Sequence, residues 1–160
     1  MYDELLRIKQ YREQTAAQAV RCQQSLLEQQ SQVLDQTRED ATRFHDQRLR
    51  DEQRLFEEIR NRTVKLRDIE DFNQRTAALR EQEALLESRV LAEEKRLTEA
   101  QQAVDAARQR HLATVREREK FDQFVDVQRV AAARELMMRE ENELEEVASA
   151  SYQVRRGAES

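Results

Sequence analysis

The chain has almost no residues of the kind that turn a polypeptide. Among its 160 residues there is no proline, and the single glycine, Gly157, lies close to the C-terminus. Average usage would supply roughly 11 glycines and 8 prolines in a chain of this length. Because these two residues are the commonest in tight turns, a chain without them seldom reverses its direction. The sequence therefore predicts an all-α protein made of one or two very long helices.

The charge pattern excludes several classes of partner. Charged residues make up 38% of the chain, and acids and bases are interleaved along its length with a formal net charge of −5. The sequence contains no basic block that could bind along the phosphate backbone of a nucleic acid, so nucleic acid is not expected as a partner. The chain has four lysines and lacks the basic face of a membrane-binding helical module. No signal peptide and no apolar run of about 20 residues is recognised, so direct membrane insertion is not expected.

The only cysteine, Cys22, cannot form an internal disulfide, which fits a reducing cytoplasm. Free cysteine is among the most frequently buried residue types. We therefore expect Cys22 to be a small core residue.

Apolar residues recur at steps of three and four, which is the pattern of a coiled-coil seam. Downstream, the repeat is formed by Ile69, Phe72, Leu79, Leu86, Val90, Leu97, Ala100, Val104, Ala107, Phe121 and Val125. Upstream, it is formed by Leu5, Ile8, Ala19, Cys22, Leu26, Val33, Ala41, Phe44, Leu55 and Ile59. The upstream repeat has an eight-residue step from Val33 to Ala41, where we expect the supercoil to relax.

Several positions of these seams hold polar residues, which should lower the stability of the coiled coil and fix its register. They are Arg12, Thr15, Gln29, Glu83, Glu93, His111 and Arg118.

The two seams do not join in one phase across residues 60–68. Arg60 and Arg62 at the start of this stretch, and Asp68 at its end, have the charges that favour the end of one helix and the start of the next. The sequence thus predicts a long antiparallel two-helix coiled-coil hairpin, monomeric in isolation. We expect one domain over residues 1–160, with helix one at about 3–60, a turn at about 61–66, helix two at about 67–150 and a frayed tail at 151–160.

Helix two is the longer helix, so its residues from about 126 onward lack a partner in the hairpin. This part still contains Val127, Val130, Ala131, Leu136, Met137, Met138, Leu144 and Val147. Docking of another molecule and dimerisation or fraying are equally consistent with this composition.

No arrangement of residues points to catalysis or to a cofactor. The two histidines, His45 and His111, have no zinc-binding pattern around them, and no glycine-rich loop is present to hold phosphate. The acidic residues 140–146 are not accompanied by a calcium-binding loop. Two helices packed side by side also offer no dry concavity for a reaction. We expect a protein that is not an enzyme and binds no metal.

Four short segments carry a resemblance to a known family: Asp51-Glu-Gln-Arg-Leu-Phe56, Asp68-Ile-Glu70, Ala77-Ala-Leu-Arg-Glu-Gln-Glu-Ala-Leu-Leu-Glu87 and Glu143-Leu-Glu-Glu146. With these segments the chain resembles the YscO (SctO) family of type III secretion proteins, relatives of the flagellar protein FliJ. The resemblance implies a central stalk that docks in the pore of the hexameric secretion ATPase and connects it to the export gate of the inner membrane. It also implies secretion chaperones as partners, and a cytoplasmic location at the inner-membrane apparatus. The alternative is a self-associating coiled-coil scaffold or spacer without an ATPase partner.

Two sets of residues are candidates for these contacts. At the open end of the hairpin, six exposed residues are candidates to pair with acidic loops of the ATPase pore. Each single residue is equally consistent with an ordinary solvated side chain. This set is Arg7, Tyr11, Arg12, Gln123, Arg129 and Arg134. At the tip, Phe56 and Phe72 are expected either to form an exposed patch for the export gate or to stack on each other and close the hairpin.

Overall fold

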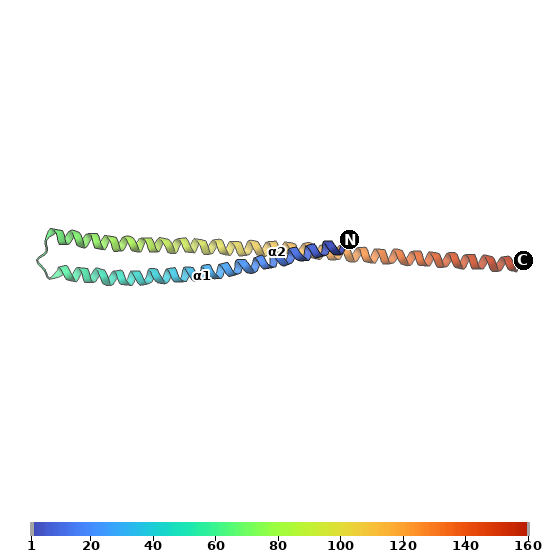
Figure 1. The fold of residues 1–160 in the computed structure, drawn as a ribbon, viewed down its shortest axis with the longest axis horizontal. Helices are drawn as coiled ribbons and strands as arrows, with labels where there is room; N and C mark the ends of the chain where they lie inside the picture. Colours follow the sequence, from blue (N-terminus) through green and yellow to red (C-terminus); the bar gives the residue numbers. More distant parts are fainter. Residues whose placement is uncertain (1, 160) are drawn as a thin grey trace. The chain divides into compact units, whose positions relative to one another are not determined.

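The computed structural model describes residues 2–159 and contains two α-helices joined by a short loop (Figure 1). Helix α1 spans Tyr2–Arg60 and helix α2 spans Leu66–Ala158. No strand is present within residues 2–159. The prediction of an all-α fold made of two long helices is confirmed.

The residues group into two compact units, each of which pairs part of α1 with part of α2. The central unit is Ala16–Arg110, and the terminal unit combines Met1–Thr15 with His111–Ser160. Within the central unit the two helices run side by side in opposite directions on either side of the loop (Figure 1). The expectation of one domain over the whole chain stays a prediction.

The loop at 61–65 lies where the two seams lose phase. The Asp68 carboxylate accepts a hydrogen bond from the Lys65 backbone N–H at 3.2 Å, and the Lys65 carbonyl accepts the Asp68 N–H at 3.0 Å. A side chain in the first helical turn thus satisfies a donor that the helix leaves open. Asp68 at the start of α2 and Arg60 in the last turn of α1 have the charges that the helix dipole favours. The residues around the chain reversal therefore replace glycine and proline as the signal for it.

The α2 seam follows the predicted repeat closely. Val104 and Ala107 are buried in the central unit, and Val125 is buried in the terminal unit. Phe72, Leu79, Leu86, Val90, Leu97, Ala100 and Phe121 are half-buried. Ile69 is the exception at 44% exposed, since it lies in the first turn of α2 beside the loop.

The predicted α1 seam is wrong in its upstream half, because the true seam lies one residue later. Val33 is 46% exposed, whereas Leu34 is 2% exposed. The residues that face α2 at steps of seven are Leu6, Glu13, Val20, Leu27, Leu34 and Ala41. The step from Leu34 to Ala41 is an ordinary heptad, so the supercoil relaxation predicted between Val33 and Ala41 is also wrong.

The same shift corrects other expectations for α1. Leu5, Ile8, Ala19 and Leu26 are exposed, and so is Cys22, which is not a core residue. Because leucine or valine precedes a leucine at 5–6, 26–27 and 33–34, either register looks apolar in the sequence. Of the predicted polar seam residues, Arg12, Thr15 and Gln29 are exposed, while Glu83, Glu93, His111 and Arg118 lie in the seam as expected.

A polar layer crosses the seam of the central unit, in the half that is nearer the loop. Arg48 of α1 forms ion pairs with Glu83 of α2 and, at 2.9 Å, with Glu52 one turn along α1. His45 contacts the other oxygen of Glu83, and Arg80 donates to Glu52 at 3.2 Å. The hydrogen bond with His45 is the main reason that the pKa of Glu83 lies below its usual value; burial opposes this shift and Arg48 adds to it. Burial raises the pKa of Glu52, but the hydrogen bonds from Arg48 and Arg80 hold it below the usual value.

The prediction that α2 ends at about residue 150 and is followed by a frayed tail is wrong, since the helix continues to Ala158. No glycine or proline occurs before Gly157 to end the helix. Arg155 and Arg156 lie in its last turn, where positive charge is favourable. From residue 126 to 158 every α2 residue is exposed, which confirms that the paired part of α2 ends at Val125.

The α1 register can be tested with adjacent truncations. Leu34→Ala removes a buried side chain and should lower the free energy of unfolding by about 2–3 kcal/mol. Val33→Ala should change it by no more than about 0.5 kcal/mol, since Val33 is exposed and alanine favours helix. Urea unfolding followed by circular dichroism measures both values. The reverse order of effects would contradict the register described here.

The polar layer predicts a specific loss of stability in acid. The folded-state pKa of Glu83 is lowered, so its contribution is present above the ordinary glutamate pKa of about 4.3 and is lost as the pH falls through the lower folded-state value. Glu83→Gln should therefore lose less stability than the parent between about pH 5 and pH 3. Glu39→Gln, which alters an exposed pair with Arg43, is the matched control and should follow the parent. Thermal midpoints across this range decide between an effect of Glu83 and a general effect of acid.

Candidate protein interaction sites

The described residues expose several surfaces that are candidates for contacts with other proteins. Within residues 2–159 no group of three or more histidine, cysteine, aspartate or glutamate side chains is placed to hold a metal ion. In the same residues no helix is long and apolar enough to cross a membrane. Three surfaces stand out instead: the hairpin tip, the start of α1 beside α2, and the unpaired part of α2.

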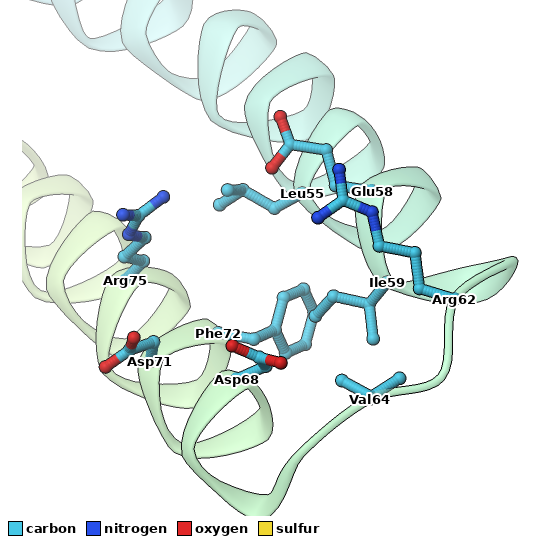
Figure 2. A pocket seen from close by; sticks show the side chains of 9 residues that line it. All are labelled: Leu55, Glu58, Ile59, Arg62, Val64, Asp68, Asp71, Phe72 and Arg75. Carbon is cyan, nitrogen blue, oxygen red and sulfur yellow. The ribbon is translucent and has the colours of Figure 1, made fainter.

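At the hairpin tip a hollow of about 240 Å³ opens between α1, the loop and α2 (Figure 2). Phe72 points from α2 towards Ile59 of α1, and Val64 of the loop lies below them (Figure 2). Charged side chains surround this apolar base. The lining residues are Leu55, Glu58, Ile59, Arg62, Val64, Asp68, Asp71, Phe72 and Arg75.

The two predicted tip residues differ in their environments. Phe72 is half-buried, whereas Phe56 is 55% exposed. Both line a second hollow on the neighbouring side of the tip. The ring contacts within residues 2–159 join other aromatic residues, so Phe56 and Phe72 share a surface without stacking. Phe56 is therefore the more accessible of the two.

The six residues predicted for the open end are all exposed in the terminal unit. Arg129 approaches Asp3 at 3.7 Å, and both side chains remain largely in solvent. Tyr11 and Gln123 each lie two residues from a seam position, near the side of the helix that faces away from its partner. Because Arg129 and Arg134 lie beyond Val125, where α2 is unpaired, these six residues are spread along the terminal unit rather than forming one patch.

Sequence reasoning missed an aromatic cluster at the start of α1. The ring of Tyr2 meets the ring of Phe124 edge-on at 5.8 Å and lies 6.4 Å from that of Phe121. The ammonium group of Lys9 lies 5.7 Å from the centre of the Phe121 ring, within the range of a cation–π interaction. Phe121 and Phe124 are one helical turn apart, but only the pairing of the helices shows that Tyr2 joins them. The cluster closes the paired part of the terminal unit.

Next to this cluster lies a second polar layer. Arg118 contacts Glu13 of α1 and pairs with Asp122 at 2.8 Å. The hydrogen bond with Glu13 is the main reason that the pKa of Arg118 is raised, so the arginine is held in its charged form. The register of the terminal unit thus depends on a charged pair across the seam.

The third surface is the part of α2 beyond Val125. The apolar side chains of this part are not covered by α1 or by another part of α2. Its large apolar side chains are between 52% and 72% exposed. They are Val127, Val130, Leu136, Met137, Met138, Leu144, Val147, Tyr152 and Val154. Five glutamates follow within residues 140–146.

Comparisons with known proteins agree on one family. The family model described as type III secretion protein YscO matches residues 2–150. The Yop proteins translocation protein O of Yersinia pseudotuberculosis serotype I (strain IP32953) is 34% identical over 118 residues, which cover 68% of this chain and 75% of that protein. The crystal structure of type III secretion protein YscO from Vibrio parahaemolyticus matches with a TM-score of 0.86 and 29% identity, covering 91% of this chain and 92% of that one. The chain therefore belongs to the YscO family of type III secretion proteins.

Proposed function

We propose that this YscO-family protein is the central stalk of a type III secretion ATPase. In this role it docks in the pore of the hexameric ATPase, links the ATPase to the export gate and presents a surface to secretion chaperones. It works by binding other proteins and without catalysis of its own, on the cytoplasmic side of the inner-membrane apparatus.

The single observation that best supports this proposal is the way the terminal unit ends. The helix pair closes at the Tyr2, Phe121 and Phe124 cluster, and α2 then continues alone to Ala158. A pair of helices is roughly 20 Å across and a single helix roughly 10 Å, so both are thin enough for a ring pore. A helix pair that continues as one exposed helix suits insertion, because the unpaired part of α2 can make contacts on all sides.

The positive residues of the terminal unit provide a charge pattern for the ATPase contact. Arg7, Arg12, Arg129 and Arg134 are exposed and lie on different sides of the helices. Acidic loops arranged around a pore would meet such charges whichever side they approach. This arrangement fits a central element in a ring better than one flat interface.

The tip supplies a separate surface for the export gate. Phe56 is exposed, Phe72 forms the half-buried base beside it, and the two hollows of the tip are rimmed by charged residues. An accessible aromatic residue next to a shaped hollow is a common anchor of protein interfaces. The two proposed partners therefore bind different units of the chain.

The second candidate function is a self-associating scaffold. The exposed apolar residues of α2 favour it, since unpaired apolar faces can drive association of identical chains. Concentration-dependent dimers in solution would favour the scaffold, and a monomer that binds the ATPase would favour the stalk.

Reversing the four arginines tests the ATPase contact. The combined change Arg7→Glu, Arg12→Glu, Arg129→Glu and Arg134→Glu should reduce stimulation of the partner ATPase by about ten-fold or more, because exposed charges facing acidic loops become repulsive. Stimulation by the parent should also weaken with added salt. Steady-state ATP hydrolysis with increasing amounts of stalk protein measures both effects.

The matched control reverses four exposed arginines of the central unit, Arg21, Arg89, Arg108 and Arg110. This variant has the same net charge as the test variant and should stimulate the ATPase like the parent. Equal loss in the two variants would show an effect of total charge and would refute the assignment to the terminal unit.

Phe56→Ala tests the export-gate contact without disturbing the seam. The side chain is 55% exposed, so the thermal midpoint should stay within a few degrees of the parent. Binding to the cytoplasmic domain of the gate should weaken by about ten-fold, as expected for an aromatic anchor. Isothermal titration calorimetry measures the affinity. Phe72→Ala should lose stability as well as binding, and unchanged binding in both variants would remove the tip from the interface.

A further inference from the structure

The unpaired part of α2 has an apolar face with its own repeat, and charged residues interrupt this face. Val130, Met137 and Leu144 follow one another at steps of seven, and each is at least half exposed. Ala131 and Met138 repeat beside them at the same step, and Tyr152 continues that row two heptads after Met138. Steps of seven place side chains on one side of a coiled-coil helix. We call these six residues, together with Arg134, Glu141 and Glu145 between them, the outer stripe.

The outer stripe is not a continuation of the seam that pairs α2 with α1. The seam positions of Phe121 and Val125 continue as Gln128, Ala132, Glu135, Arg139, Asn142 and Glu146, which are mostly polar. The outer stripe lies roughly 130–180° around the helix from them, for 3.5 to 3.6 residues per turn. A helix that occupies the outer stripe must therefore approach from the side of α2 that faces away from α1 within the terminal unit.

The charges of this segment favour a basic occupant. Residues 135–146 contain six glutamates and one arginine, and that arginine, Arg139, already pairs with Glu135 at 2.9 Å. Glu141 and Glu145 lie within the outer stripe itself, in the gaps between Met138, Leu144 and Tyr152. A partner that covers the apolar residues must also bring cations to these two carboxylates, because an unpaired charge at an interface is costly.

A second copy of the chain meets these requirements poorly. An antiparallel copy that covers the stripe from Val130 to Tyr152 places Glu141 opposite Glu141 of that copy. An antiparallel copy shifted so that Arg155 and Arg156 meet Glu141 and Glu140 is centred on Ala148. Within the described part of α2, this shifted copy leaves Val130 and Met137 uncovered. Neither of these two antiparallel arrangements both covers the stripe and neutralises its glutamates.

We propose that the outer stripe is the docking surface for a basic amphipathic α-helix of a partner protein. The apolar face of that helix covers Val130, Met137, Leu144 and Tyr152, and its lysines or arginines pair with Glu141 and Glu145. The adjacent residues Met137 and Met138 suit this role, since flexible thioether side chains adapt to helices of different shape. This surface is separate from the proposed export-gate contact, and Arg134 is the residue that it shares with the set proposed for the ATPase contact.

A pair of designed peptides tests this proposal on the full chain. The basic probe is a fluorescent helix of about 28 residues, four heptads, with leucine on one face and lysine on both flanks. The acidic probe replaces every lysine by glutamate. Fluorescence anisotropy should show the basic probe binding at least about ten-fold more tightly than the acidic one, and the difference should shrink with added salt.

Two pairs of variants locate the binding site. Val130→Gln, Met137→Gln and Leu144→Gln together should weaken binding of the basic probe by about ten-fold or more. Leu136→Gln, Val147→Gln and Val154→Gln, which are equally exposed but lie off the stripe, should bind like the parent. Likewise, Glu141→Gln with Glu145→Gln should weaken binding several-fold, whereas Glu143→Gln with Glu146→Gln, on the opposite side of α2, should have little effect.

Several outcomes would overturn the proposal. Equal binding of the two probes would show a surface that is merely apolar, and failure of both to bind would show that the stripe is not a helix-docking surface. Equal effects of the on-stripe and off-stripe variants would place binding elsewhere. Sedimentation that shows a dimer of the parent, abolished by the on-stripe triple variant, would assign the stripe to a second copy. None of these measurements uses the ATPase, so they can fail while the stalk function holds.

Discussion

The structure depends on one narrow seam between two helices. Two helices can bury only a strip of each other, so fully buried residues are few: Leu34, Val104, Ala107 and Val125 among those described. The large polar surface and the importance of the helix register both follow from this limit. The polar surface is large because little of each helix is covered, and the register matters greatly because a shift of one residue would move leucines such as Leu34 into solvent.

Polar layers within the seam add specificity at a cost in apolar contact. Arg48 with Glu83 in the central unit, and Arg118 with Glu13 in the terminal unit, join α1 to α2 through charges that find their partners in only one alignment. A buried or half-buried charge without its partner is unfavourable, so a shifted alignment would be penalised at both layers. The apolar seam supplies attraction, and the polar layers select one alignment of the two helices.

The surfaces proposed for partners lie where the seam stops within each unit. At the tip of the central unit, the loop spreads the helices and Phe56 is exposed beside the half-buried Phe72. In the terminal unit, α2 continues beyond Val125 with its apolar residues on a new side. A coiled coil cannot form a deep pocket, so it binds through exposed ends and faces. This constraint is consistent with the open hollows at the tip and with the separate surfaces proposed for partners.

Sequence analysis correctly predicts the fold class, the position of the chain reversal and the residue at which the paired part of α2 ends. These follow from local properties: the near absence of glycine and proline, the charges of Arg60 and Asp68, and the end of the apolar repeat at Val125. Sequence analysis does not predict the α1 register, because Val33 and Leu34 are both apolar neighbours and each supports a heptad. The folded structure is needed to show that Leu34 faces α2 and that Tyr2 joins Phe121 and Phe124. Such choices depend on which residues of the other helix lie opposite, and that pairing is a property of the folded chain.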